Sequence, residues 1–170
     1  ALTTPAYCWY DNNKSIYNPS PNGALYNWYA VNTGKLCPAG WHVPSAAEWD
    51  SLVWFVGDSI PRDMGWLPYE RETAGIKLKE AGNAHWMLND TIHATDEYGF
   101  TALPGGNRNV YGPFFSVGER GYWWTSTEEE YDPENDDAAS REMYFDSNGV
   151  TDLHQYRKFG MSVRCVKDKP

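Results

Sequence analysis

The spacing of apolar residues in the first third of the chain predicts two helices. Four apolar residues that would share one helical face are followed by a glycine placed to end the helix: Ala24, Leu25, Trp28, Val31 and Gly34. The second helix carries a stronger signal, because Ser45 and Glu48 have the spacing of a capping box. Its apolar stripe stops at a second glycine and comprises Trp49, Leu52, Val53, Val56 and Gly57.

Residues 57–98 show little periodicity, which predicts a long and mostly irregular region with short elements. Alternation of apolar and polar positions then predicts strands over residues 99–103, 122–126, 141–146 and 161–166, the first of them ending at a Pro-Gly-Gly turn signal. Asn148-Gly149 is the strongest hairpin signal and should return the chain into residues 150–153. Helices followed by an antiparallel sheet indicate an α+β fold. We expect two helices packed on a small antiparallel sheet, with long ordered loops.

The alternation within residues 141–146 predicts which side chains face the core. Met143 and Phe145 should point inward, whereas Glu142, Tyr144 and Asp146 should project outward. On the returning strand the outward face should continue through Thr151, Leu153 or His154, Tyr156 and Arg157. This surface would combine carboxylates with tyrosines on a stiff strand.

Length and composition favour one domain over residues 1–170. Nine Trp, twelve Tyr and six Phe are more aromatic side chains than a small core can hold, so some should be displayed, as in binding surfaces. The opening residues 1–5 look like the start of a mature or excised domain. No stretch approaches the roughly 18 apolar residues of a transmembrane helix.

The negative charge is concentrated in one segment. Residues 128–152 contain ten acidic residues and one basic residue, which equals the net charge of −9 of the whole chain. An acidic protein without basic runs is not expected to bind nucleic acid. A neutral scaffold that displays one acidic, tyrosine-bearing surface is typical of a recognition protein.

Three cysteines, Cys8, Cys37 and Cys165, allow one disulfide and one free thiol. A Cys37–Cys165 bridge would tie the middle of the chain to its last strand, and three free thiols are the alternative.

Six blocks in order resemble the Fibrobacter succinogenes major paralogous domain, over about residues 7–167. They are residues 24–31, 37–45 with Glu48-Trp49, 77–80, 99–106, 121–128 and 162–166. The resemblance implies a C-type-lectin-like fold, which is also used by retroelement-diversified variable proteins. It further implies an extracellular or cell-surface bacterial protein, or a phage virion protein. In the diversified relatives, ligand-binding variation falls between the double-Trp block and the final strand, here residues 129–160.

This interval and its border contain the expected ligand-binding residues: Trp124, Tyr131, Glu142, Tyr144, Asp146, Thr151, His154, Tyr156 and Arg157. Tyrosines supply rigid contact area, and carboxylates would bind sugar hydroxyls or basic protein groups. The alternative is a solvated strand face without a ligand. The expected partner is a protein receptor or a glycan.

An acidic run could hold calcium through Asp132, Glu134, Asp136 and Asp137. It begins like an EF-hand loop, but Asp137 replaces the glycine of the sixth position and Met143 the glutamate of the twelfth. A solvated acidic loop is the competing interpretation.

The sequence lacks signs of catalysis. His42, beside Trp41 and before a capped helix, is more typical of a buried structural hydrogen-bonding residue, and no metal-binding histidine spacing or nucleophile motif occurs. We therefore expect a non-catalytic adhesin or receptor-binding module. The alternative is an accessory domain of a larger surface protein, such as a fimbrial tip or lipoprotein.

Overall fold

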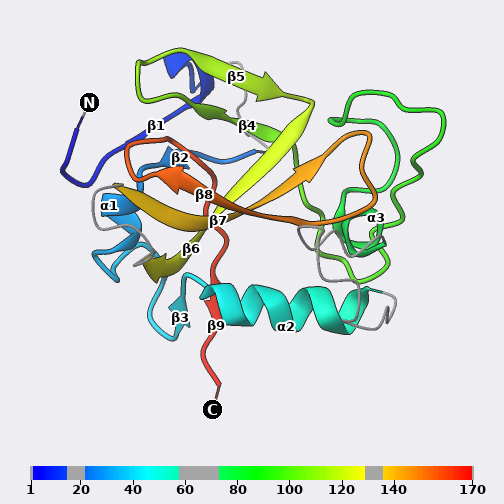
Figure 1. The fold of residues 1–170 in the computed structure, drawn as a ribbon, viewed down its shortest axis with the longest axis horizontal. Coiled ribbons are helices and arrows are strands. Elements are labelled where there is room, and N and C mark those ends of the chain that lie inside the picture. The colour runs from blue at the N-terminus through cyan, green and yellow to red at the C-terminus, as the bar shows by residue number, and fades with distance from the viewer. Residues whose placement is uncertain (1, 15–21, 58–72, 129–135, 170) are drawn as a thin grey trace.

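The computed structural model describes residues 2–14, 22–57, 73–128 and 136–169. In this part the chain forms three short helices, one 3-10 turn and nine strands in three sheets (Figure 1). The helical elements are η1 (Tyr10–Asn12), α1 (Trp28–Val31), α2 (Ala46–Val56) and α3 (Ala74–Leu78). The α+β prediction is confirmed, with one helix more than expected. No helix among these residues is both long and apolar enough to cross a membrane.

A five-stranded sheet forms the centre of the molecule, in the order β5-β4-β6-β7-β8. Its strands are β4 (Gly105–Arg108), β5 (Phe114–Val117), β6 (Arg120–Glu128), β7 (Asp137–Tyr144) and β8 (Thr151–Tyr156). β4 and β6 are parallel and the other neighbours are antiparallel, so the sheet is mixed and not antiparallel throughout as predicted. Two small sheets pair distant segments: β1 (Tyr7–Cys8) with β2 (Leu25–Tyr26), and β3 (Trp41–His42) with β9 (Val166–Lys167).

Helix α2 forms as its sequence predicts. The Ser45 hydroxyl accepts a hydrogen bond from the Glu48 N–H, and the Glu48 carboxylate accepts one from the Ser45 N–H, so the capping box is complete. Its apolar stripe is buried against the sheet, with Leu52 half-buried. Local signals are sufficient here because both the cap and the stripe lie within one segment.

The first predicted helix is shorter than expected. Leu25 and Tyr26 form a strand, Asn27 caps the helix through its side chain, and α1 begins only at Trp28. The Tyr26 backbone exchanges two hydrogen bonds with Met161. This pairing involves a distant segment, so local periodicity could not predict it. The predicted apolar face is nevertheless buried, because Ala24, Leu25, Trp28 and Val31 all lie in the interior.

The predicted strand over residues 99–103 is wrong. Only Ala102 forms a bridge there, to Lys79, and regular pairing begins at Gly105, inside the predicted turn. Gly106 has φ +62°, and a Cβ atom on it would lie 2.3 Å from the Phe115 carbonyl oxygen. The glycines therefore allow close strand approach as well as a bend. Pairing over 161–166 is also mostly irregular: Met161 and Ser162 form single bridges, and the regular strand is β9.

The β7–β8 hairpin is confirmed, with Glu142 opposite Thr151. Asn148-Gly149 does not form a tight two-residue turn, because residues 145–150 connect the strands and neither Asn148 nor Gly149 has a positive φ. This connection is held by α3 and the residue that follows it. Lys79, which is buried, donates from Nζ to the carbonyl oxygens of Tyr144 and Ser147, and burial lowers its pKa to about 8. Gly75 approaches the Gly149 carbonyl so closely that a Cβ atom would lie 2.2 Å from it.

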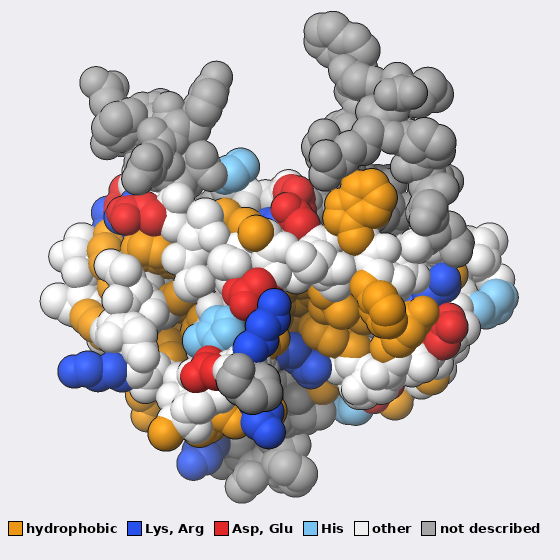
Figure 2. Space-filling model, turned by 90° about the horizontal axis from the view of Figure 1, so that it is seen from below, with side chains coloured by type: hydrophobic (Ala, Val, Ile, Leu, Met, Phe, Trp, Pro, Cys, Tyr) orange, Lys and Arg blue, Asp and Glu red, His pale blue; other side chains and the backbone are white. Residues whose placement is uncertain are grey.

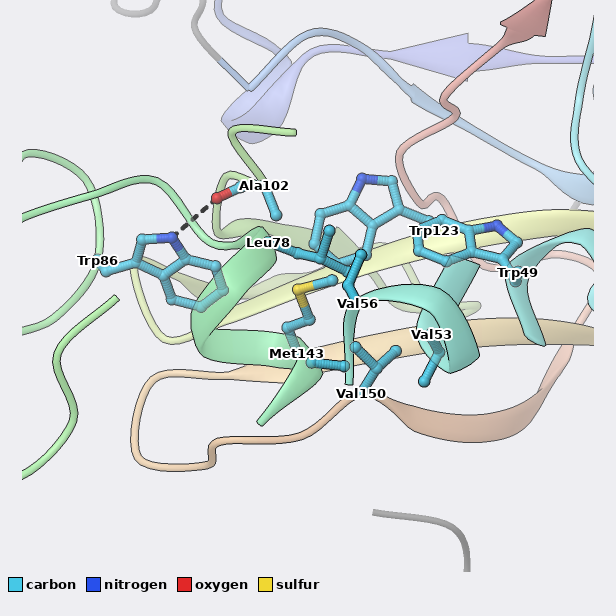
Figure 3. Packing of buried hydrophobic residues seen from close by; sticks show 10 residues of the cluster. Trp49, Val53, Val56, Leu78, Trp86, Ala102, Trp123, Met143 and Val150 are labelled. Atoms are coloured by element: carbon cyan, nitrogen blue, oxygen red, sulfur yellow. Dashed lines mark hydrogen bonds between the residues drawn. The ribbon is translucent and has the colours of Figure 1, made fainter. Parts of the chain in front are cut away.

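Hydrophobic cores lie on both faces of the β6–β7 pair. One core packs under α2 and α3 and includes Trp49, Leu78, Trp86, Trp123, Met143 and Val150 (Figure 3). The other packs beside α1 and includes Trp28, Val31, Tyr122, Trp124, Ala138 and Met161. Because neighbouring residues of a strand point to opposite faces, residues 138–143 are buried without a break.

The predicted Cys37–Cys165 disulfide is present, with Cα atoms 5.8 Å apart, and Cys8 is the free cysteine. The bridge joins the segment before β3 to the segment before β9, next to the pairing of these two strands.

The His42 imidazole joins the residue that follows β9 to α2. Its Nδ1 atom lies 2.6 Å from Asp168 Oδ1, and its Nε2 atom lies 2.9 Å from Glu48 Oε1. Hydrogen bonds to these carboxylates, Asp168 first, raise the pKa of His42 above its usual value. The residue thus has the structural role that the sequence predicts, although its side chain is half-exposed rather than buried.

We expect folding stability to fall as the pH rises through the His42 pKa. A histidine with a raised folded-state pKa contributes its full stabilisation below about pH 6.5 and loses it above the folded-state value. Urea denaturation between about pH 6 and pH 8.5 measures this loss, and NMR titration reports the pKa itself. Asp168→Asn should lower the pKa and flatten the dependence. An unchanged His42 pKa in that variant would contradict the assignment.

Candidate ligand-binding site

The structure divides the predicted ligand-binding face between two sides of the sheet. The β7–β8 register places Glu142 beside Thr151 on one face, and Ala139 beside His154 on the other. Tyr156 shares the face of His154, and both are exposed. Asp146 is exposed in the hairpin turn. The prediction that these side chains form one continuous face is therefore wrong, because Thr151 and Tyr156 point to opposite faces of β8.

Glu142 is buried rather than outward-facing, with 8% of its surface exposed. Its Oε1 atom lies 2.6 Å from Arg120 Nη1, and the same guanidinium lies 4.3 Å from the centre of the Tyr144 ring. Burial and the Glu142 charge raise the pKa of the neighbouring Tyr122 to about 12. This group stabilises the sheet, and its carboxylate already has a cationic partner. Phe145 packs on the core as predicted.

Trp124 also belongs to the interior. It is fully buried, and its indole Nε1 donates to the Tyr26 carbonyl oxygen at 2.8 Å. This hydrogen bond joins the central sheet to β2. Tyr131 lies outside the described residues.

Arg157 and Lys158 pair with acidic residues at the end of β6 and just before β7. Arg157 Nη2 lies 2.6 Å from Glu128 Oε1, and Lys158 Nζ lies 3.1 Å from Asp136 Oδ2. Burial acts to raise the pKa of Asp136, but hydrogen bonds from Tyr29 and Lys158 outweigh it and hold the pKa below the usual value. Arg157 also lies over the Trp28 ring at 4.7 Å.

The calcium hypothesis stays a prediction. Asp132 and Glu134 lie outside the described residues, while Asp136 is paired with cations and Asp137 begins β7. Among the residues that the structure does describe, no three His, Cys, Asp or Glu side chains form a group that could hold a metal ion.

A pocket of about 310 Å³ lies at a different place, between β1 and the turn that joins β4 to β5. Both border the same upper-left end of the molecule in Figure 1, away from α2 and the C-terminus. Four separate segments line the pocket: Leu2 and Ala6–Cys8, then Leu25 and Asn27, then residues 108–112, and finally Lys158 and Gly160. The last two belong to the interval 129–160. The charged lining residues are Arg108 and Lys158, without any carboxylate.

Arg108 is held in place at the wall of this pocket. Its backbone exchanges two hydrogen bonds of 2.8 Å with Gly160, and its Nε donates to the Gly112 carbonyl oxygen. The guanidinium lies over the Phe114 ring. Burial raises the pKa of the Cys8 thiol, opposed by Arg108. Within the described part of the chain, Arg108 has no carboxylate partner.

Two exposed tyrosines flank the pocket. Tyr111 is 91% exposed and Tyr7 is 67% exposed. Tyr111 is presented by a turn in which Asn109 accepts from the N–H groups of Tyr111 and Gly112. Gly112 has φ +109°, a conformation that favours glycine. Sequence reasoning missed this site because its walls come from four distant segments, although Asn109 and Gly112 were a local turn signal.

A second exposed aromatic group lies on the α2 side of the molecule. Phe55 is 74% exposed, and its ring centre lies 5.6 Å from that of Tyr98. Figure 2 shows this side, where hydrophobic side chains gather beside charged ones. The group does not line the pocket.

Comparison with known proteins identifies the family but not the ligand. No curated protein and no solved structure matches the chain. The family model described as the Fibrobacter succinogenes major domain matches residues 1–167, which is nearly the whole chain. The protein therefore belongs to the Fibrobacter succinogenes major domain family.

Proposed function

We propose that this domain is a non-catalytic ligand-binding module that recognises a protein or glycan on another surface. The pocket beside β1 carries the proposal, because it combines two exposed tyrosines with a guanidinium that has no carboxylate partner among the described residues, on an otherwise acidic protein. Such a combination of shape, aromatic area and a few polar groups is what small ligand sites require. The β7–β8 hairpin would be part of the scaffold, with the end of β8 leading into the pocket.

A binding role rather than catalysis is supported by the chemistry of the pocket lining. The lining contains no carboxylate and no imidazole that could serve as a general base. Its thiol has a raised pKa, which disfavours the reactive thiolate. The remaining groups of the lining can bind a ligand and orient it.

Our proposal includes the C-type-lectin-like fold and an extracellular location on a bacterial cell or phage virion. The central five-stranded sheet, with α2 and α3 on one face and α1 on the other, is compatible with that fold. The disulfide between Cys37 and Cys165 supports an oxidising compartment.

The first experiment is a glycan array with the purified domain, run with calcium and with chelator, beside pull-downs from cell surfaces. Binding that disappears with chelator would make the acidic segment a metal site. Binding in both conditions would support recognition without a metal. If neither the array nor the pull-downs detect binding, the binding function is overturned and the accessory role is favoured.

Tyr111→Ala should weaken binding to any captured ligand by about tenfold or more, since a displayed tyrosine is a typical hot spot. It should leave the free energy of unfolding within about 0.5 kcal/mol, because the side chain is almost fully exposed. Phe55→Ala is the matched control, as it removes another exposed ring outside the pocket. Isothermal titration calorimetry measures both. Equal losses of affinity in the two variants would place the ligand elsewhere.

A further inference from the structure

We propose that the pocket binds acidic saccharides, and that Arg108 pairs with their carboxylate or sulfate group. This inference rests on the proposed binding function and specifies its ligand class.

The charge balance singles out Arg108. The whole chain carries a net charge of −9, yet the charged residues that line the pocket are both cations. Lys158 is neutralised by Asp136 at 3.1 Å, whereas Arg108 pairs with no carboxylate among the described residues. The half-buried guanidinium is only partly compensated for its lost hydration, by the Gly112 carbonyl and the Phe114 ring, and a bound anion would supply a charged partner.

The guanidinium is also fixed before any ligand arrives. The contacts to Gly112 and Phe114 hold the side chain, and they use only part of its hydrogen-bonding capacity. Guanidinium groups present several donors in one plane and match the two oxygens of a carboxylate or sulfate. A fixed donor loses less side-chain entropy on binding, which favours affinity.

Backbone pairing in the walls favours a saccharide over a peptide. Arg108 pairs with Gly160, Ala6 with Asn27, and Cys8 with Leu25, so these backbone groups are already used. Extended peptides are commonly recognised through main-chain hydrogen bonds along a free sheet edge, and the open edge of β1 in this wall is only two residues long. What remains is side-chain chemistry: a guanidinium and two exposed phenol rings, whose faces can pack on a sugar ring while their hydroxyls bond its hydroxyls. The volume of about 310 Å³ is at the lower end for small-ligand sites and suits a sugar of monosaccharide size.

Cys8 provides a direct reporter of this pocket, because it lines it and is the one cysteine outside the disulfide. Alkylation rates should be measured with anionic iodoacetate and with neutral iodoacetamide. Both reagents react with the same thiolate, so the ratio of the two rates cancels changes in the thiol pKa and in its burial. Arg108→Gln should lower this ratio by about threefold or more at low ionic strength, because the local attraction for anions is lost. Lys35→Gln removes the same charge from an exposed site outside the lining and should leave the ratio unchanged.

Protection of Cys8 in the unmodified protein then identifies the ligand class. Glucuronate and glucose 6-sulfate should slow the reaction with iodoacetamide, whereas glucose at the same ionic strength should not. Equal protection by glucose would overturn the acidic ligand but leave the proposed binding function standing. Stronger protection by N-acetylglutamate amide would overturn the saccharide assignment in favour of an acidic peptide. If none of these probes protects and the rate ratio is the same in Arg108→Gln, the inference is refuted.

A folding defect in Arg108→Gln would not decide the matter, because the guanidinium also packs on Phe114. Arg108→Lys keeps the charge but not the planar fork. In this variant the ratio of the iodoacetate rate to the iodoacetamide rate should stay close to that of the unmodified protein. Glucuronate, however, should no longer protect Cys8. A Lys variant that keeps full protection would contradict the pairing that we propose.

Discussion

Met143→Asp is expected to leave the domain unfolded. Met143 is 1% exposed and lies beside Leu78 and Val150 in the core under α2 and α3 (Figure 3). An aspartate there would be a buried charge without a partner, or a protonated acid in an apolar cavity. Either form costs several kcal/mol, which is comparable with the about 5–15 kcal/mol that keeps a typical domain folded. Far-UV circular dichroism and the dispersion of amide signals in NMR spectra measure the outcome.

Met143→Leu separates the effect of charge from that of shape, because it keeps the volume and should cost less than about 1.5 kcal/mol. Tyr144→Ala changes the next residue, which is half-buried on the other face, and should leave the domain folded. A folded Met143→Asp variant with near-normal stability would show that the Met143 side chain is not buried in this core.

Removing the disulfide is expected to have the second large effect. The bridge closes a loop across a sequence separation of 128 residues, and the chain-entropy treatment assigns roughly 4–5 kcal/mol to a loop of that size. The double variant Cys37→Ser with Cys165→Ser should therefore unfold at a much lower urea concentration than the natural chain. It should also loosen the β3–β9 pair, since the bridge lies next to both strands.

Cys8→Ser is the control for the loss of a cysteine without loss of the bridge, and it should change the unfolding midpoint little. Reduction of the natural chain with dithiothreitol should reproduce the effect of the double variant. A midpoint unaffected by reduction would mean that the bridge adds no net stability in solution.

The features predicted correctly are those whose signals lie within one short segment. The capping box of Ser45 and Glu48, the apolar stripe of α2 and the pairing of β7 with β8 all involve neighbours in the chain, although the turn between the two strands is longer than Asn148-Gly149 suggests. The α+β class follows from the order of these segments. The disulfide was predictable as one of two alternatives, since three cysteines permit few arrangements.

The incorrect predictions concern residues whose environment is supplied by distant segments. The alternation within residues 141–146 predicts an outward-facing Glu142 carboxylate, but the second core and Arg120 cover that face of the sheet. The Pro-Gly-Gly signal predicts a turn at Gly105 and Gly106, but these residues pair with β5 and β6. The apolar spacing predicts that Leu25 is helical, but it forms a strand that pairs with β1.

The sequence by itself determined the family, the α+β class, α2 and the hairpin, because hydrophobic spacing, capping and turn chemistry act between near neighbours. The tertiary structure alone decided that the β7 strand is buried on both faces. It alone also brought Cys8, Arg108, Tyr111 and Lys158 to one pocket. The physical reason is that a pocket depends on side chains from separate segments meeting in space, and one sequence contains no record of which distant segments will pair.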